Sequence, residues 1–562
     1  MKPARKCACG AAFLLAAGLI FSPLLAAVLG THLKRYAVMA SFHGVAGPSL
    51  TSIEAACASA VFAVVLGTPF AILVERSGPS LKHALWALGL LVLMIPPYLA
   101  AESWIVLLGP AGQISRPASL LLGLGPHPAN PVEAARYTAP AFVYTWFGVG
   151  TVMAGCLFPV VALAVASTLR RTDRRVFEAA RIMQGSAGVR RLALRILVPP
   201  VLGGALLVFA ATLTEFAVPQ LLRVRTLGET VYERIQEGDL ASAAVLSFSV
   251  MPLVVAVGGL GAFVLLRARA ASLAGLEGEA PKFAEPKGGL SDNARAAVAG
   301  LVALTPGLLL SITSLVWLTA TAVVPGSSAL GQHNVLRASG LLDSLRGAWE
   351  LAQADAVRTV LLAVLTAFLA TGFAVLLLRL APGNSRGWWL GALSGGLAVP
   401  APVVGLGLII LWDHAWAAAF YQSLGIVVLA WLSRFLPLTI LLVQGALARV
   451  PKELEHAAAL AGRGVWGRFQ SVVLPNAWPG LAAAWLATYV FSATEFSATL
   501  LIAPPGRPLL APSIVNLMRR GQDPEIAACQ FLLLSVVALP LAALVLGAGL
   551  RGWAQSRRGA PA

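Results

Sequence analysis

Charged residues are scarce in this chain of 562 residues. Asp, Glu, Lys and Arg together make up 12% of it, whereas an ordinary soluble protein has about a quarter. Apolar residues make up 58%, and the mean hydropathy is +0.81. This composition excludes a water-soluble fold and is typical of a membrane protein.

The chain also lacks the patterns of common metal and nucleotide sites. Its five cysteines include no Cys-X-X-Cys pair, and none of its seven histidines has a metal-ligand spacing. There is no Gly-X4-Gly-Lys-Ser/Thr loop of the kind that holds the phosphates of ATP. We therefore expect no cofactor, no metal site and no enzymatic activity in this chain, including ATP hydrolysis.

Apolar stretches recur along the whole chain. A spanning helix needs about 20 mostly apolar residues, and twelve segments meet this requirement. The sequence therefore predicts an all-α polytopic membrane protein with about 12 transmembrane helices. The predicted spans are residues 11–30, 50–74, 84–108, 139–168, 199–222, 240–266, 297–325, 356–378, 388–412, 417–444, 477–502 and 526–550. The first follows basic residues as a secretory signal would, but its apolar part is longer than a typical signal core, so we predict that it is retained.

The net charge of +17 follows the membrane topology. If the N-terminus is cytoplasmic, Lys and Arg concentrate in the cytoplasmic loops, with the largest block from Arg170 to Arg195. This predicts a multi-pass protein of the bacterial inner membrane with both termini in the cytoplasm. The basic residues then face the lipid bilayer and its surface, and we expect no nucleic-acid partner.

A long segment occurs twice. FEAARIMQGSAGVRRLALRILVPP, at 177–200, is matched by EHAAALAGRGVWGRFQSVVLP, at 455–475. Thr-Glu-Phe follows both copies, at 214–216 and 494–496. Glu178 precedes Glu455 by 277 positions, and the two Thr-Glu-Phe motifs are 280 apart. So constant a spacing indicates an internal duplication.

Each copy of the duplication holds six predicted spans, so the two repeats run in parallel. Gly, Pro, Lys and Glu cluster between them and predict a cytoplasmic linker. Upstream, Pro96 and Pro400 are 304 positions apart, which predicts an external insertion in the first half at about 109–138. The predicted parts are a first half at 1–267, a linker at 268–296 and a second half at 297–562.

Each copy of the repeated loop predicts a short helix, a turn and a second helix on the cytoplasmic face. Glu178 suits a first helical turn, and Gly185 and Gly462 can adopt the left-handed conformation that ends a helix. Pro199 and Pro475 suit the start of the next span. An alternative is that these are basic loops that anchor the spans to lipid headgroups. Two copies in register favour a docking site for another protein.

These segments resemble the EAA loop of binding-protein-dependent ABC importer permeases, in which Glu-Ala-Ala precedes a Gly and a closing hydrophobic-Leu-Pro. The fused two-half plan extends the resemblance to nearly the whole chain. It implies a type I ABC importer permease fold, with coupling loops at 169–198 and 445–475 that dock on two copies of an ABC ATPase subunit carrying ATP-Mg. The coupling residues it implies are Glu178, Ala179, Ala180, Gly185, Glu455, His456, Ala457, Ala458 and Gly462.

Both copies depart from the family pattern. The first copy is two residues longer between Glu and Pro and has Gln184 where the family's Gly would fall. The second keeps the family spacing only if His456 takes the Glu position, which leaves Glu455 one step early.

The segment ATEFSATLLIAPPGRPLLA, at 493–511, resembles the ferric-iron permease group, which includes thiamine and aminoethylphosphonate relatives. The resemblance implies a periplasmic substrate-binding protein as partner and import by alternating access. Ferric iron is the first choice of cargo; thiamine, aminoethylphosphonate and polyamine are the alternatives.

Glu215 and Glu495 interrupt helices that are otherwise apolar. A carboxylate inside a membrane is costly and is by default a hypothesis of function. The two can face each other across the pseudo-two-fold axis and favour a cation in the pathway. The predicted pathway residues are Thr214, Glu215, Thr494, Glu495 and Ser497. The alternative is that each Glu pairs with a nearby arginine, such as Arg223 or Arg225.

Five arginines follow the Thr-Glu-Phe helices in predicted external loops: Arg223, Arg225, Arg507, Arg519 and Arg520. We predict that they dock acidic patches on the binding protein, an attraction that weakens as salt rises. Attraction of an anionic substrate is the alternative.

Two other classes of protein remain open. A secondary transporter can also have parallel six-span repeats and would use an ion gradient, but it has no need of a paired loop. A membrane enzyme would need polar residues clustered at one depth, and only the isolated glutamates occur.

Overall fold

The computed structural model of the chain is built almost entirely of helices. It describes residues 3–29, 46–108, 141–172, 174–248, 289–312, 338–380, 395–518 and 528–540, with a few isolated positions and two short strands besides. The strands β1 (Thr321–Ala322) and β2 (Val335–Leu336) have two residues each and pair antiparallel. The predicted all-α class is therefore confirmed.

The helices form two compact units, each of which is described by itself. Unit 1 comprises Met1–Ser22, Trp317–Arg386 and Leu411–Ala562, and unit 2 comprises Pro23–Val316 and Gly387–Ile410. The units cut across the predicted halves, because α1 (Pro3–Leu29) begins in unit 1 while α14 (Leu290–Leu304) belongs to unit 2. The boundaries of the two halves stay a prediction. The last residues of the predicted linker are helical, since α14 begins at Leu290.

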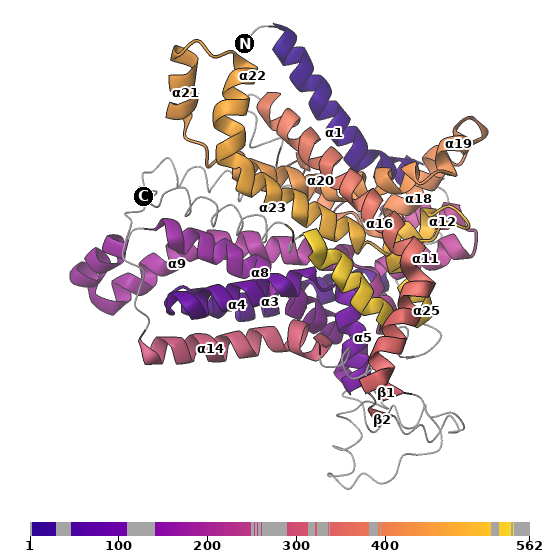
Figure 1. Cartoon of the computed structure of the whole chain (residues 1–562), viewed down its shortest axis with the longest axis horizontal. Coiled ribbons are helices and arrows are strands. Elements are labelled where there is room, and N and C mark those ends of the chain that lie inside the picture. Colours follow the sequence, from indigo (N-terminus) through magenta and orange to yellow (C-terminus); the bar gives the residue numbers. More distant parts are fainter. Residues whose placement is uncertain are drawn as a thin grey trace, which may run out of the picture. The chain divides into compact units, whose positions relative to one another are not determined.

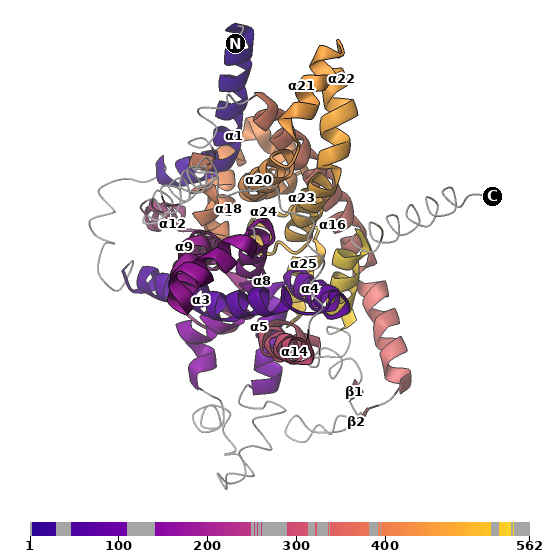
Figure 2. The same cartoon turned by 90° about the vertical axis from the view of Figure 1, so that its left-hand side faces the viewer.

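Three helices form the centre of unit 2: α3 (Gly47–Val74), α8 (Trp146–Arg171) and α9 (Arg174–Thr214) (Figure 2). A Cβ on Gly67 of α3 would lie 2.6 Å from the carbonyl oxygen of Phe158, so only glycine allows α8 to approach this closely. Small residues at such contacts are how helices associate in lipid, where no hydrophobic effect drives them together. Helix α14 packs along α3.

Shorter helices complete unit 2. Helices α4 (Pro79–Met94) and α5 (Pro97–Leu108) are bent by 94° at the break before Pro97. Helix α9 leads into three short helices. The remaining elements are η2 (Ala141–Tyr144), α10 (Ala217–Leu221), α11 (Leu227–Gln236), α12 (Leu240–Phe248), η3 (Thr305–Leu309), η4 (Gly395–Ala398) and most of α18 (Ala401–Trp412).

Unit 1 is built around α16 (Ala338–Leu380), α20 (Gly425–Leu447) and α23 (Leu474–Ala493), which pack on one another (Figure 1). Its short elements are η5 (Ala415–Ala417), α19 (Ala418–Tyr421), α21 (Lys452–Leu460), α22 (Val465–Arg468), η6 (Phe469–Val473), α24 (Ser497–Ile502) and α25 (Leu510–Met518).

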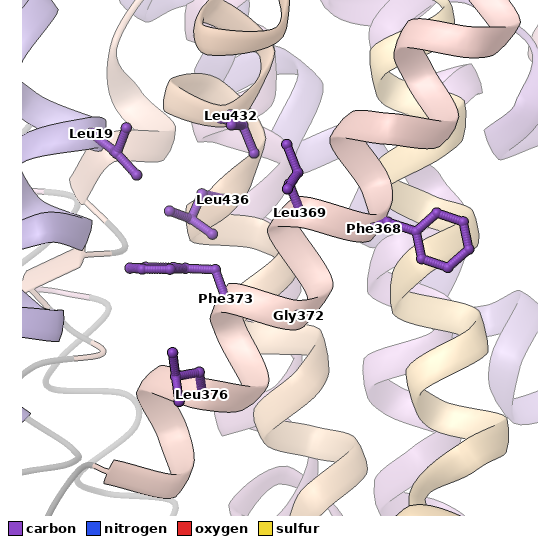
Figure 3. Close-up of a pocket in the computed structure, with 8 residues that line it drawn as sticks. All are labelled: Leu19, Phe368, Leu369, Gly372, Phe373, Leu376, Leu432 and Leu436. Atoms are coloured by element: carbon purple, nitrogen blue, oxygen red, sulfur yellow. The ribbon is translucent and has the colours of Figure 1, made fainter.

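An apolar groove of about 440 Å³ lies beside α16 in unit 1 (Figure 3). Only apolar residues line it, including Leu19 of α1, Phe373 of α16 and Leu432 of α20. A Cβ on Gly372 would meet no atom within 4 Å, so the groove runs past the helix backbone. Such a lining suits helices embedded in hydrocarbon and offers nothing to bind a polar substrate.

Six helices of the described residues are long and apolar enough to cross a membrane, or up to eight if each of two bent pairs counts as one span. Two shorter apolar helices, Gly10–Ala26 and Ala528–Pro540, overlap the first and last predicted spans. The predicted insertion at 109–138 and most of the predicted span 240–266 lie outside the described residues. The multi-pass architecture is confirmed, and the count of twelve stays a prediction.

Candidate functional site

The second repeated segment forms the predicted helix, turn and helix. Helix α21 ends at Leu460, and Gly462 has a φ of 77°. The N–H of Gly462 donates to the carbonyl of Ala459 at 3.0 Å, and the N–H of Arg463 donates to that of Ala458 at 3.1 Å. This is the Schellman pattern, which closes a helix with a glycine in the left-handed region. The chain then continues into α22, η6 and α23.

The first segment breaks at the corresponding glycine. Gly185 has a φ of 63° and a ψ of −152°, and it divides α9 into two helical parts. Gly185 lies seven positions after Glu178, and Gly462 lies seven after Glu455. Alignment of the segments on these two glycines makes Glu178 and Glu455 counterparts. The structure thus favours Glu455, rather than His456, as the counterpart of the first-copy glutamate.

Both segments expose large apolar side chains. Ile182 and Met183, just before Gly185, are 87% and 81% exposed. Leu460, just before Gly462, is 90% exposed, and Trp466 of α22 is 68% exposed. Figure 1 shows α21 and α22 side by side beyond the end of α23 in unit 1. Exposed apolar residues gathered on a projecting hairpin mark an interaction surface.

An ion pair fixes the second segment to the end of α16. Arg379, in the last turn of α16, donates through Nη1 and Nη2 to the two carboxylate oxygens of Glu455, at 3.1 and 3.0 Å. The hydrogen bonds from Arg379 hold the pKa of Glu455 below its usual range, although partial burial opposes this. Sequence reasoning missed Arg379; its only signal is a basic residue at the end of a span.

A different cluster lies at the corresponding end of α3. Glu75 is bound by Arg170 of α8 at 2.6 Å and by Lys82 of α4 at 2.7 Å, and it accepts a hydrogen bond from the indole of Trp86. Burial raises the pKa of Glu75, but the hydrogen bonds from Arg170 and Lys82 outweigh this effect and hold it below the usual range. The cluster ties α3, α4 and α8 together just before the first coupling segment.

Glu495 lies at the break between α23 and α24 and is almost fully enclosed, with its side chain 2% exposed. Its Oε1 accepts from Arg434 Nη1 and from the N–H of Ala498, both at 2.9 Å. Its Oε2 accepts from the N–H of Thr499 at 2.9 Å and from the hydroxyl of the same residue at 2.5 Å. The carboxylate therefore caps α24 and neutralises Arg434 of α20.

Glu215 has different surroundings. It is partly exposed, and its Oε1 accepts from the N–H of Ala217 at 3.0 Å. Arg434 lies three residues before Pro437 of α20, and the residue three before Pro159 of α8 is Cys156. The two halves therefore differ at this position of the helix, where α20 has the arginine Arg434 and α8 has the thiol of Cys156. Arg434 lies within the predicted span 417–444, but nothing in the sequence reveals its ion pair with Glu495.

The other pathway candidates bond locally. Thr214 and Thr494 donate to helical carbonyls, those of Ala211 and Val490, and Ser497 is buried. The arginine that binds Glu495 is Arg434, rather than Arg223 or Arg225, and Arg225 pairs with Glu233 at 3.1 Å. That these residues line a pathway stays a prediction.

The arginines of the predicted external loops differ in conformation. Arg223 has a φ of 55° and closes α10 in the Schellman pattern, with its N–H bonded to Gln220 and that of Val224 bonded to Pro219. Glycine usually fills this position, because a Cβ is strained there. In unit 1, α24 ends at Ile502, and the turn that follows has Gly506, with a φ of 76°, directly before the exposed Arg507, whose N–H donates to the carbonyl of Pro504 at 3.2 Å. Arg519 and Arg520 lie outside the described residues.

Comparison with known proteins identifies the family. The family model of the binding-protein-dependent transport system inner membrane component matches residues 67–270. Residues 67–270 thus match the permease domain of this family. The match takes in α8, the first coupling segment and the Thr-Glu-Phe motif that follows it. This permease is thus a multi-pass inner-membrane component of a binding-protein-dependent ABC importer.

Curated relatives agree on the class of protein and differ in the cargo that their names state. The permease is 29% identical over 224 residues to the putative 2-aminoethylphosphonate transport system permease protein PhnV of Salmonella typhimurium, covering 39% of this chain and 84% of the relative. It is 27% identical to the molybdenum transport system permease protein ModB of Mycobacterium tuberculosis, covering 43% and 89%. It is 29% identical to the Fe(3+)-transport system permease protein FbpB 2 of Haemophilus influenzae, covering 19% and 21%.

Proposed function

We propose that this permease is the complete, fused transmembrane pathway of an ATP-driven importer, with one coupling segment for each of two ATPase subunits. The observation that carries the proposal is the pair of helix breaks at Gly185 and Gly462, each preceded by exposed apolar side chains. A single permease half would need only one such segment. The spacing of 277 positions between the two glycines supports a duplication of the whole coupling device.

The mechanism that fits this arrangement is alternating access. A loaded periplasmic binding protein docks on the external arginines, and the ATPase subunits close on ATP-Mg at the coupling segments. Their closure moves the segments and opens the pathway outward, and hydrolysis on the ATPase resets it. This orientation places both termini in the cytoplasm.

Ferric iron is the cargo that we propose. The name of the Haemophilus relative and the partly exposed Glu215 support it, because a carboxylate favours a cation. An oxyanion is the second candidate, favoured by the names of the PhnV and ModB relatives and by the exposed Arg223 and Arg507.

Reconstitution with a co-expressed ABC ATPase subunit tests the coupling role. Leu460→Asp places a charge on the exposed end of α21, and Leu290→Asp, at a residue 89% exposed at the start of α14, is the matched control. We expect Leu460→Asp to abolish copurification of the ATPase and ATP-dependent uptake, and Leu290→Asp to preserve both. Equal behaviour of the two variants, or uptake driven by an ion gradient without an ATPase, would refute the proposal.

A further inference from the structure

Helix α16 connects the second coupling segment with the predicted external face of the same unit. At one end Arg379 binds Glu455 of α21 through two hydrogen bonds. Thr359 lies in the middle of α16, near the external end of the predicted span 356–378, and its Oγ1 accepts the N–H of Leu510, the first residue of α25, at 2.9 Å. Arg379 lies 20 residues after Thr359, which at 1.5 Å per residue is about 30 Å, the thickness of the hydrocarbon core.

The middle part of α16 makes more than one contact with the segment that begins at Pro508. Arg358 Nη1 donates to the carbonyl of Pro508 at 2.8 Å, and the hydroxyl of Ser513 donates to Asp355 at 2.5 Å. The segment held in this way directly follows Arg507, a predicted docking residue for the binding protein. A displacement of this segment therefore acts on α16 at several points.

The helix between Thr359 and Arg379 is uninterrupted. No proline occurs from Ala338 to Leu380, and sharp kinks in helices occur mainly at prolines. A displacement at one end is therefore carried to the other with little bending. The groove beside Gly372 leaves room on one face of the helix for such a movement (Figure 3).

Helix α3, the counterpart of α16 in unit 2, makes the same kind of contact on the predicted external side. Its other end makes different contacts. Ser52 Oγ accepts the N–H of Leu227, the first residue of α11, at 2.9 Å, as Thr359 does for Leu510. Pro69 lies inside α3, and Glu75 at its end binds Arg170 of α8 and Lys82 of α4. Among the contacts of the described residues, α16 reaches its coupling helix through Arg379 and Glu455, whereas Glu75 at the end of α3 binds α8 and α4.

We propose that α16 is the element through which docking of the binding protein reaches the second coupling helix, with Thr359 and Arg379 as its positioning residues. The inference rests on the proposed function. It adds the helix and the two residues through which the signal reaches the second coupling segment.

The test is a double-mutant cycle on the complex of permease, ATPase and binding protein in nanodiscs. The measured quantity is the ratio of ATPase activity with and without binding protein loaded with ferric iron. Couplings between distant sites are typically worth a 2- to 30-fold change. We expect Thr359→Val and Arg379→Gln each to lower this ratio about fivefold. The ratio of the double variant should be no lower than that of Arg379→Gln alone, because both substitutions interrupt the same connection. Thr359→Ser, which keeps the hydroxyl, should keep the ratio.

Ser52→Ala is the matched control, because it removes the equivalent hydroxyl from α3. In the double variant of Ser52→Ala and Arg379→Gln, the two fold-changes in the ratio should multiply, as expected for independent distant sites. A multiplying effect of Thr359→Val and Arg379→Gln, or an unchanged ratio in Thr359→Val, would overturn the inference. A wild-type complex that binds the ATPase but shows no stimulation would also overturn it, whereas failure of the wild-type permease to bind any ATPase would refute the proposed function itself.

Discussion

Removal of Arg434 should strongly destabilise the permease, because Glu495 would be left as a buried charge. The two side chains are 15% and 2% exposed. Loss of one partner from a buried ion pair costs about 3–5 kcal/mol. Ala498 and Thr499 still donate three hydrogen bonds to the carboxylate, so we expect the lower end, about 3 kcal/mol, for Arg434→Met.

Thermal unfolding in detergent measures this effect. At about 2–4 °C per kcal/mol for a unit of this size, the apparent melting temperature should fall by about 6–12 °C. Arg434→Met combined with Glu495→Gln removes both charges and should recover part of the loss. Cys156→Ala, at the counterpart position in α8, should cost only about 1 kcal/mol as a small cavity. A melting temperature within about 2 °C of wild type for Arg434→Met would refute the ion-pair account, as would a double variant less stable than both single ones.

Three further predictions follow from particular residues. Gly462→Ala should strain the end of α21 by about 1–2 kcal/mol and weaken binding of the ATPase, as measured by titration. Gly464→Ala, at a residue with an ordinary φ, should change the affinity for the ATPase little. Equal affinities of the two variants would contradict the role of the turn. Arg223→Gly should stabilise unit 2 by about 1 kcal/mol, since it relieves the positive φ, and should weaken docking of the binding protein; a destabilised variant would contradict the strain. Burial and the neighbouring Glu233 raise the pKa of Glu229 to about 7 from an ordinary 4.5, so the folded state holds this proton more tightly and stability falls as pH rises from 4.5 to 7. Glu229→Gln should reduce the difference between the melting temperatures measured at pH 5 and pH 8. An unchanged difference would count against the raised pKa of Glu229.

Hydropathy and the internal repeat were sufficient to predict the class of fold. Long apolar stretches must form helices in a bilayer, because every backbone polar group needs a partner within its own segment. The helix-ending role of Gly185 and Gly462 was predictable as well, since glycine is the residue that most easily adopts a positive φ. The duplicated spacing showed that the two glycines belong together.

Other features depend on tertiary contacts that a single sequence does not reveal. Sequence order places α14 in the second half, yet it packs on α3 of the first. The pairs Arg379–Glu455 and Arg434–Glu495 join residues 76 and 61 positions apart, and no local pattern marks them. The 277-position spacing already paired Glu178 with Glu455, and the two positive-φ glycines, each seven positions later, give the same register.

Uptake by proteoliposomes that contain the permease, its ATPase and a loaded binding protein is the most direct test of the central claim. One permease chain with two ATPase subunits should take up cargo only when ATP is supplied, and Leu460→Asp should abolish uptake while Leu290→Asp preserves it. Uptake that proceeds without the ATPase under a proton or sodium gradient would contradict the account.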